Sequence, residues 1–382
     1  MRFLLNILFF LSYFISSAQI NRCSTDEYRN NLKDRGLYNY HKQEIVYNKL
    51  LNVNYTIPVV VHVLYNNNNQ NISDERIFSQ IQTLNEDYNM SNLDLINVPL
   101  EFQSNIGNVG FSFCLVQQDL QGNPFTGINR VYTEVDIFQG FTDDMKFSSQ
   151  GGVDAWDPLN YLNIWVCDLS GNTLGFATMP GDVDPELDGV VIDYEYFGVD
   201  LSSDSPYNLG RTGTHEIGHY FNLEHTFYAG CSDWDGCDDT PSLSSPTYGC
   251  PAFPQESCQS INMTMNYMDY TNDACMHMFT ICQAEIMVNA LSTYRSDLIS
   301  DNDCSIKLID YVEDKSVNLY PNPFSDILTI DIQNENILMY DIYGRNVLNQ
   351  YIENDNNLNL SYLPSGNYFI FIKNKIYKII KN

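Results

Sequence analysis

The chain has 382 residues, enough for two or three domains, and 44% of them are hydrophobic, which supports a sizeable core. Its 19 Lys and Arg against 48 Asp and Glu give a formal net charge of −29. So acidic a surface argues against a nucleic-acid partner, because nucleic-acid binding requires a basic footprint. Acidic loops of this kind are also able to hold calcium.

The N-terminus has the features of a secretory signal peptide over residues 1–18. Arg2 precedes an apolar run, and small residues follow it up to a predicted cleavage site after Ala18. The run is too short for a membrane span, and no later stretch approaches 18 apolar residues, so we expect none. Export to a secreted or cell-surface location would allow disulfides among the ten cysteines.

Residues 19–55 are polar, charged and poorly periodic. The β-branched run at 57–65 then predicts a buried strand, within which His62 is best interpreted as a satisfied core residue. Ser73 is a good cap for the helix that follows. Its apolar stripe consists of Ile77, Ile81, Leu84 and Tyr88.

Three later segments also read as strands, at 111–115, 161–167 and 188–193. Cys114 and Cys167 either pair across the sheet or remain free buried thiols. Pro180 suits an edge strand, since it cannot donate to a ladder. A peptide lying along such an edge would gain backbone hydrogen bonds whatever its sequence.

Residues 215–225 read HEIGHYFNLEH and carry the strongest chemical signal. His215 and His219 share one helix face, and Glu216 completes an H-E-x-x-H pattern in which Glu acts as general base. His225 can join them only if the helix ends near Asn222, which tolerates left-handed backbone geometry. Three imidazoles and a water would give a four-coordinate zinc. This clustering favours zinc over a solvated helix face.

The stretch resembles the extended zinc motif of the metzincin metallopeptidases, with Asn222 where the usual form has Gly. Together with the Thr and Phe that follow His225, it looks like the ulilysin-like pappalysin/cytophagalysin branch. Asn-Tyr-Met-Asp-Tyr at 266–270 is similar to the metzincin Met-turn. The resemblance, which covers about 57–287, implies that Met268 supports the histidines from below and that Tyr270 reaches toward the metal. The plain alternative for Met268 is core filler.

The same resemblance implies that residues 19–55 are a pro-peptide and that strand 174–180 lines the substrate cleft. Cys23 lies in Arg-Cys-Ser-Thr, similar to the R-C-G-T latency motif of ulilysin-like proenzymes, with Ser24 in place of Gly. Because a thiolate is a good zinc ligand, Cys23 would occupy the water position until cleavage. The alternative is a disulfide, with Cys304 as partner.

After His225 the chain is irregular and rich in cysteine, and loops of this length need staples. The absence of a C-x-x-C spacing there disfavours the alternative, a zinc ribbon. The resemblance implies the disulfides Cys231–Cys258 and Cys250–Cys275, and further Cys237–Cys282.

Two acidic features follow the zinc motif. Asp235, Asp239 and Thr240 belong to an oxygen-rich turn that either holds calcium or is a plain polar turn. Asp273 follows the Met-turn, where the family shapes its specificity pocket. An acid there would fit a basic residue after the cleaved bond.

Residues 279–291 look helical, and the composition becomes β-rich from 316 onward. Strands are predicted at 327–330, 337–341 and 368–372. The Y-P-N-P start, the L-x-x-G-x-Y turn and the Lys-rich end resemble a type IX secretion sorting domain. That resemblance implies a β-sandwich read by the export machinery; the alternative is a carbohydrate- or protein-binding sandwich.

We therefore predict an α+β protein whose metzincin-like domain at 56–300 has a twisted mixed sheet, a zinc helix and a loop-rich, disulfide-stapled lower half. A linker at 301–315 would lead to a small β-sandwich at 316–382. The predicted function is a secreted zinc endopeptidase acting on extracellular polypeptides, with Glu216 as base and Tyr270 stabilising the oxyanion. The rivals are a binding or adhesive protein with a non-catalytic zinc site and another zinc hydrolase, such as an amidase.

Overall fold

The computed structural model describes residues 21–39, 54–232, 235–299, 317–333, 335–341, 346–352, 356–372 and 375–382. The predicted signal peptide at 1–18, the linker at 301–315 and residues 40–53 of the predicted pro-peptide lie outside these ranges. We refer to residues 21–39 as the N-terminal segment.

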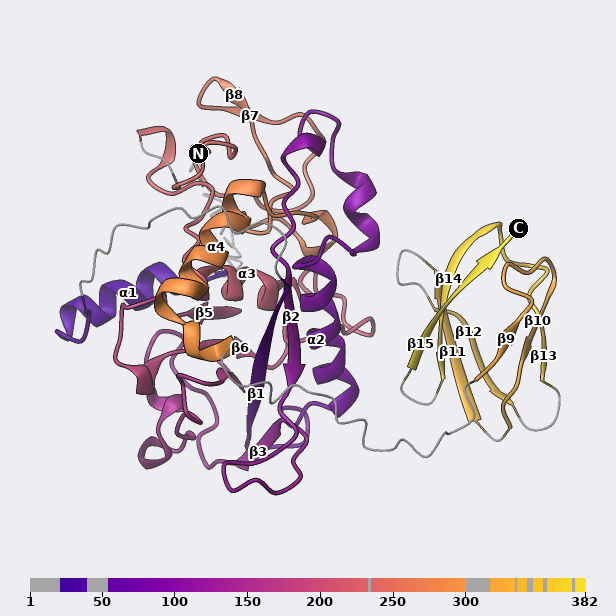
Figure 1. Cartoon of the computed structure of the whole chain (residues 1–382), viewed down its shortest axis with the longest axis horizontal. Coiled ribbons are helices and arrows are strands. Elements are labelled where there is room, and N and C mark those ends of the chain that lie inside the picture. The colour runs from indigo at the N-terminus through magenta and orange to yellow at the C-terminus, as the bar shows by residue number, and fades with distance from the viewer. Residues whose placement is uncertain are drawn as a thin grey trace, which may run out of the picture.

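The larger part of the chain is built on a six-stranded sheet in the order β2-β1-β4-β6-β5, with β3 also paired to β1 (Figure 1). All pairings are parallel except β5 with β6, and β5 lies at the edge. The predicted edge strand is therefore confirmed, although it is shorter than expected, and β3 was not predicted. The strands are β1 (Tyr55–Tyr65), β2 (Phe111–Leu115), β3 (Ile128–Tyr132), β4 (Leu162–Cys167), β5 (Gly175–Ala177) and β6 (Val190–Asp193).

Side chains alternate between two cores, one on each face of the sheet. Ile164 and Val166 of β4 enter one core, whereas Trp165 and Cys167 enter the other, as the two-residue period of a strand requires. The first core is closed by three helices, α2 (Asp74–Asp87), α3 (Arg211–Tyr220) and α4 (Ile281–Tyr294). Ser73 caps α2 as expected, by accepting a hydrogen bond from the backbone N–H of Arg76.

The second core includes a helix that the sequence did not predict, α1 (Thr25–Asp34) of the N-terminal segment. Tyr28 and Leu32, one helical turn apart, are both fully buried in that core. The poor periodicity of residues 19–55 therefore gave no indication of this helix. His62 is buried and lies within hydrogen-bonding distance of Asn129 and Asn163, which confirms its structural interpretation.

The predicted staples are confirmed at Cys231–Cys258, Cys250–Cys275 and Cys237–Cys282. A Cys114–Cys167 pair is wrong, because Cys114 is disulfide-bonded elsewhere and Cys167 is a free buried thiol. The sheet explains this, because β1 lies between the strands that carry the two cysteines. Cys114 aligns with Pro58 of β1, whereas Val166, the neighbour of Cys167, aligns with Val63, five residues further along β1. The loop-rich part also contains the short strands β7 (Glu256–Ser257) and β8 (Ser260–Ile261).

Short 3-10 helices connect many of these elements: η1 (Leu93–Asn97), η2 (Gln103–Asn105), η3 (Asp144–Lys146), η4 (Ser148–Gln150), η5 (Pro185–Leu187), η6 (Gly230–Ser232), η7 (Asp273–Cys275) and η8 (Ser296–Ile299).

The C-terminal part is the predicted β-sandwich, with sheets β13-β10-β9 and β12-β11-β14-β15 around their own core. Leu328, Met339, Leu358 and Ile370 are fully or almost fully buried there. The strands are β9 (Leu319–Tyr320), β10 (Ile327–Ile330), β11 (Glu335–Asp341), β12 (Asn346–Ile352), β13 (Asn357–Asn359), β14 (Gly366–Ile372) and β15 (Lys375–Lys381).

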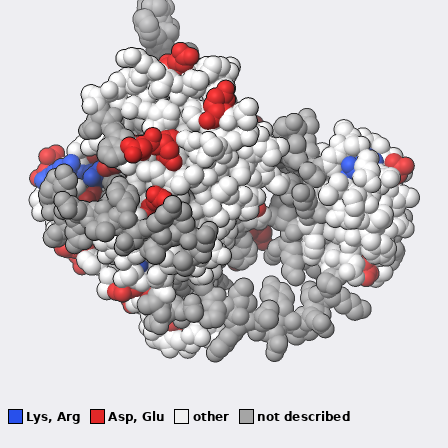
Figure 2. Space-filling view, turned by 45° about the horizontal axis from the view of Figure 1, so that its top comes forward, with Lys and Arg blue, Asp and Glu red and all other residues white. Residues whose placement is uncertain are grey.

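The acidic composition is visible on the face drawn in Figure 2, where Asp and Glu are spread widely and Lys and Arg are few. Within the described ranges, no helix combines the length and the apolar character that crossing a bilayer would need.

Candidate active site

Three imidazoles converge beside the edge strand. The Nε2 atoms of His215 and His225 lie 3.2 and 3.0 Å from Nε2 of His219. A tetrahedral zinc with Zn–N bonds of about 2.0–2.1 Å would hold its nitrogen ligands roughly 3.3 Å apart. All three rings are buried. The arrangement therefore fits one zinc ion.

The end of α3 brings His225 back to the other two. Asn222 adopts a left-handed conformation with φ 77°, and the N–H of Leu223 donates to the carbonyl of Gly218 at 3.0 Å. This is the αL helix ending expected from the sequence, and it reverses the chain direction within a few residues.

Backbone carbonyls orient the two helical histidines. Nδ1 of His215 lies 2.7 Å from the Tyr267 carbonyl, and Nδ1 of His219 lies 2.6 Å from the Leu223 carbonyl. Because Nδ1 carries the proton in these contacts, the Nε2 atom of each ring is unprotonated, and its lone pair is available to a metal ion. Burial lowers the pKa of both histidines well below the usual range, which keeps them neutral.

The Met-turn packs directly beneath α3. Gly218 allows this approach, because a Cβ there would lie 2.5 Å from Sδ of Met268. The turn is held by the Asn266 side chain, whose oxygen accepts the Met268 N–H at 2.9 Å and whose amide donates to Gln283 at 2.8 Å. Met268 thus lies under the helix that carries His215 and His219.

Glu216 is fully buried between α3 and β5. Gly175 of β5 makes room for it, since a Cβ there would be 3.1 Å from Cγ of Glu216. The Thr25 hydroxyl and the Cys23 thiol donate to Oε2 of Glu216 at 3.2 and 3.4 Å. Burial raises the pKa of Glu216 to about 8, and these hydrogen bonds oppose that shift. Its Oε1 atom is buried and accepts no hydrogen bond from the described residues.

The N-terminal segment closes the site with Cys23. Its Sγ atom and one nitrogen of each of the three histidines all lie within 4.8 Å of one another. Cys23 is a free thiol, so the disulfide alternative is not found. The Tyr270 hydroxyl donates to the carbonyl of Cys23 at 3.1 Å and lies 3.2 Å from Nε2 of His225.

The segment runs along β5 before α1 begins. The Ser24 N–H donates to the Gly175 carbonyl at 2.9 Å, and the Ala177 N–H donates to the Thr25 hydroxyl at 3.0 Å. The isolated bridge between Asn21 and Thr173 is parallel. The segment therefore uses the hydrogen-bonding positions that the sequence assigned to a substrate.

Charged contacts anchor the segment on both sides of the histidines. Arg22 pairs with Asp273 at 2.8 Å, with both side chains fully buried. On the other side, Arg29 pairs with Asp182 and Glu224, each at 3.0 Å. A carboxylate oxygen of Asp26 lies 3.2 Å from Nδ1 of His225. Neither this contact nor the ion pairs were predicted from the sequence. Only Arg22, beside Cys23, indicated a charged anchor, and the residues that pair with it lie far away along the chain.

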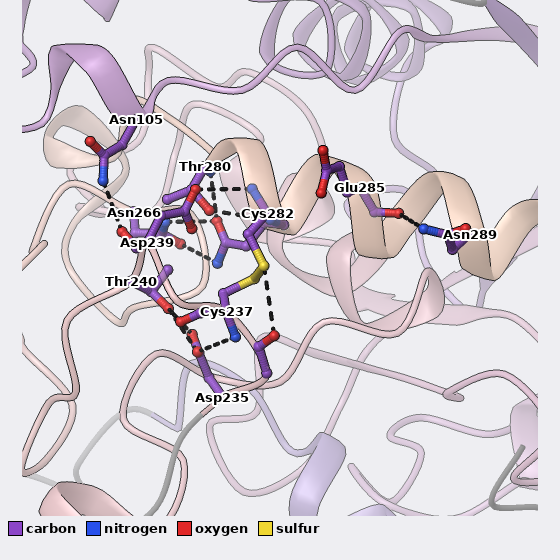
Figure 3. The surroundings of a disulfide bond; sticks show 12 residues. Asn105, Asp235, Cys237, Asp239, Thr240, Asn266, Thr280, Cys282, Glu285 and Asn289 are labelled. Atoms are coloured by element: carbon purple, nitrogen blue, oxygen red, sulfur yellow. Dashed lines mark hydrogen bonds between the residues drawn. A yellow bond between two sulfur atoms is a disulfide. The ribbon is translucent and has the colours of Figure 1, made fainter. Parts of the chain in front are cut away.

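The predicted calcium turn is engaged in protein contacts (Figure 3). The Asp235 carboxylate accepts from the Thr240 hydroxyl at 2.7 Å, and Asp239 accepts from the Cys282 N–H at 3.0 Å. Cys237, Asp239 and Cys282 lie within metal-binding distance, but the two cysteines form a disulfide and offer no thiolate. Calcium here stays a prediction.

The edge strand, the converging imidazoles and the Met-containing turn together define a zinc metallopeptidase of the metzincin class. A family profile described as pregnancy-associated plasma protein-A matches residues 147–292, and one described as a secretion system C-terminal sorting domain matches residues 318–382.

Curated relatives and solved structures agree with this class. Extracellular metalloproteases of Neurospora crassa and Colletotrichum graminicola are 32% and 31% identical to the chain, over 53% and 63% of its length and 77% and 78% of their own. Mature mirolysin of Tannerella forsythia, solved with a cleaved peptide, is 45% identical with a TM-score of 0.63, over 65% of this chain and 97% of that one. A promirolysin mutant is 40% identical with a TM-score of 0.64, over 72% and 91%.

The chain belongs to the pregnancy-associated plasma protein-A family of metallopeptidases. It is therefore a zinc endopeptidase rather than a binding protein, and its type IX sorting domain assigns it to a secreted or cell-surface location.

Proposed function

We propose that His215, His219 and His225 hold the catalytic zinc and that Glu216 is the general base for hydrolysis of polypeptide substrates. The convergence of three imidazole Nε2 atoms beside a buried carboxylate carries this assignment. Zinc bound there would polarise the peptide carbonyl and lower the pKa of a water to about 7.

Protein side chains and the edge strand carry out the proton transfers, the oxyanion stabilisation and the substrate binding. Glu216 takes the proton of the attacking water and delivers it to the leaving amine. The Tyr270 hydroxyl, free of Cys23 once the N-terminal segment has left, donates to the developing oxyanion. The edge strand β5 holds the substrate backbone with the positions that now bind Ser24 and Thr25.

Residues 19–55 act, in this proposal, as a pro-peptide that keeps the enzyme latent. Cys23 fills the ligand position that water needs, and its thiolate suits zinc. The Arg22–Asp273 pair supports both this role and the predicted preference for a basic residue after the cleaved bond, since a substrate Arg would find the same buried carboxylate.

The domain borders predicted from the sequence, 56–300 for the peptidase and 316–382 for the sorting domain, complete the proposal. The sorting domain would be recognised by the type IX export machinery.

The test is to incubate the activated protein with a peptide library, with and without a zinc chelator, and to identify the new N-termini. We expect cleavage that the chelator abolishes and that leaves Arg or Lys at the new N-termini. The Glu216→Ala protein, purified identically, is the matched control and should cleave at least about 100-fold more slowly. Cleavage that survives zinc removal would contradict the assignment, and equal cleavage before acidic and basic residues would remove the role of Asp273.

A further inference from the structure

The Tyr28 side chain fills a deep pocket beside the active-site cleft. It is fully buried, and its hydroxyl donates to Oδ1 of Asp143 at 2.6 Å. The ammonium of Lys146 donates to the same hydroxyl at 3.2 Å. The Tyr28 and Phe176 ring centroids are 4.8 Å apart. The pocket therefore has an aromatic wall and a polar end that matches a phenol.

The pocket does not depend on Tyr28 for its construction. The Lys146 ammonium is held by residues outside the N-terminal segment, because Nζ donates to the Leu187 carbonyl at 2.7 Å and lies 3.6 Å from Oδ1 of Asp143. Trp165, beside it, is fixed by a hydrogen bond from its indole to the Val153 carbonyl at 2.9 Å. Departure of α1 would thus leave a preformed pocket whose ammonium and carboxylate lack the phenol.

The pocket is continuous with the substrate path. Phe176 lies on β5 between Gly175 and Ala177, and the backbone of both neighbours binds the N-terminal segment. An extended chain along β5 would alternate its side chains between the faces of the sheet, and those on the Phe176 face would meet the pocket. Tyr28 and Arg22 lie on opposite sides of Cys23 in sequence. Because Asp273 receives the residue after the cut, the pocket serves residues before it.

We propose that Asp143, Lys146 and Phe176 form a specificity subsite for a tyrosine that precedes the cleaved bond in the substrate, an inference that rests on the proposed function and on removal of the N-terminal segment. We call it the phenol subsite. A phenylalanine would fill the apolar part and leave Asp143 and Lys146 without the hydroxyl. An acidic side chain would face Asp143, and a basic one would face Lys146, so the neutral phenol fits best.

The experiment uses internally quenched peptides with Arg after the scissile bond and Tyr, Phe or Ala at each of the four preceding positions. For activated enzyme, we expect kcat/KM at one position to rank Tyr above Phe above Ala. The Tyr-to-Phe ratio should be roughly 10- to 100-fold, as for a hydrogen bond to a charged group. Equal rates for Tyr and Phe at all four positions would overturn the subsite.

Variants identify the residues responsible. Lys146→Met should lower the Tyr-to-Phe ratio by roughly 3- to 10-fold without removing it, because the Asp143 carboxylate still accepts from the phenol. Asp144→Asn, at the exposed neighbouring position, should leave the ratio unchanged. If Lys146→Met fails to fold, as circular dichroism would reveal, Asp143→Asn provides the same test. A Tyr-to-Phe ratio equal to that of the wild-type enzyme in the folded variant would refute the role of these residues. If wild-type enzyme cleaves no peptide, including the Ala series, the proposed function itself fails.

Discussion

Replacing Arg22 with alanine should lower the affinity of the N-terminal segment for the active site more than replacing any exposed charged residue of the same segment. The Arg22–Asp273 pair is fully buried at 2.8 Å, and Arg22 also donates to the Thr271 carbonyl at 2.9 Å. Its guanidinium lies 4.7 Å from the centroid of the Tyr207 ring. All of these contacts are lost together in Arg22→Ala.

The magnitude follows from the burial. Removing one partner of a buried ion pair costs about 3–5 kcal/mol. Asp273 would keep two backbone donors, the N–H groups of Leu209 and Arg211, which favours the lower end. About 3 kcal/mol corresponds to a loss of affinity of roughly 100-fold. Arg35 is the matched control, because its side chain is 40% exposed where it pairs with Asp143, and exposed pairs contribute about 0–1 kcal/mol.

The assay is inhibition of the activated enzyme by synthetic peptides with the sequence of residues 21–39. We expect the inhibition constant of the Arg22→Ala peptide to rise roughly 100-fold over the unsubstituted peptide, and that of Arg35→Ala to rise less than about five-fold. Similar constants for the two variants would refute the reasoning that buried charge anchors the segment.

Three further variants test the catalytic site. Glu216→Ala should keep one zinc per chain and lose about 100- to 10,000-fold in turnover; a fully active variant would remove Glu216 as base. Tyr270→Phe should lower kcat by roughly 100- to 1000-fold with the fold unchanged by circular dichroism, and an unchanged kcat would exclude oxyanion stabilisation by its hydroxyl. In Gly218→Ala, the higher helix propensity of alanine should stabilise the fold by about 1 kcal/mol, whereas the clash of its Cβ with Met268 should cost about 1–3 kcal/mol. Urea unfolding should therefore show a lower free energy of unfolding than wild type. A more stable variant would argue against the close packing.

Local patterns in the sequence were sufficient for the elements that position the site. The β-branched run of β1, the Ser73-capped stripe of α2 and the left-handed turn at Asn222 each follow from neighbouring residues. By contrast, β3 has Asn129 and Arg130 at its centre and lacks an apolar signature, although it is paired along its length with β1. Pairing partners supply the stability there, and they are distant in sequence.

The contacts of the N-terminal segment were unpredictable for the same reason. α1 offers only Tyr28 and Leu32 as a buried apolar stripe, and most residues of the core that receives them lie more than a hundred positions away. The free thiol of Cys167 depended on strand register, which a single sequence does not specify when two cysteines lie on different strands. The ion pair of Arg22 likewise became visible only with the fold.

X-ray absorption at the zinc edge, recorded on the full chain before and after removal of residues 19–55, tests the central claim most directly. The account predicts three nitrogens at about 2.0 Å and one sulfur at about 2.3 Å before activation, with the sulfur replaced by oxygen afterwards. A zinc shell without sulfur in the full chain would contradict latency through Cys23. A shell with fewer than three imidazole nitrogens would contradict the site formed by His215, His219 and His225.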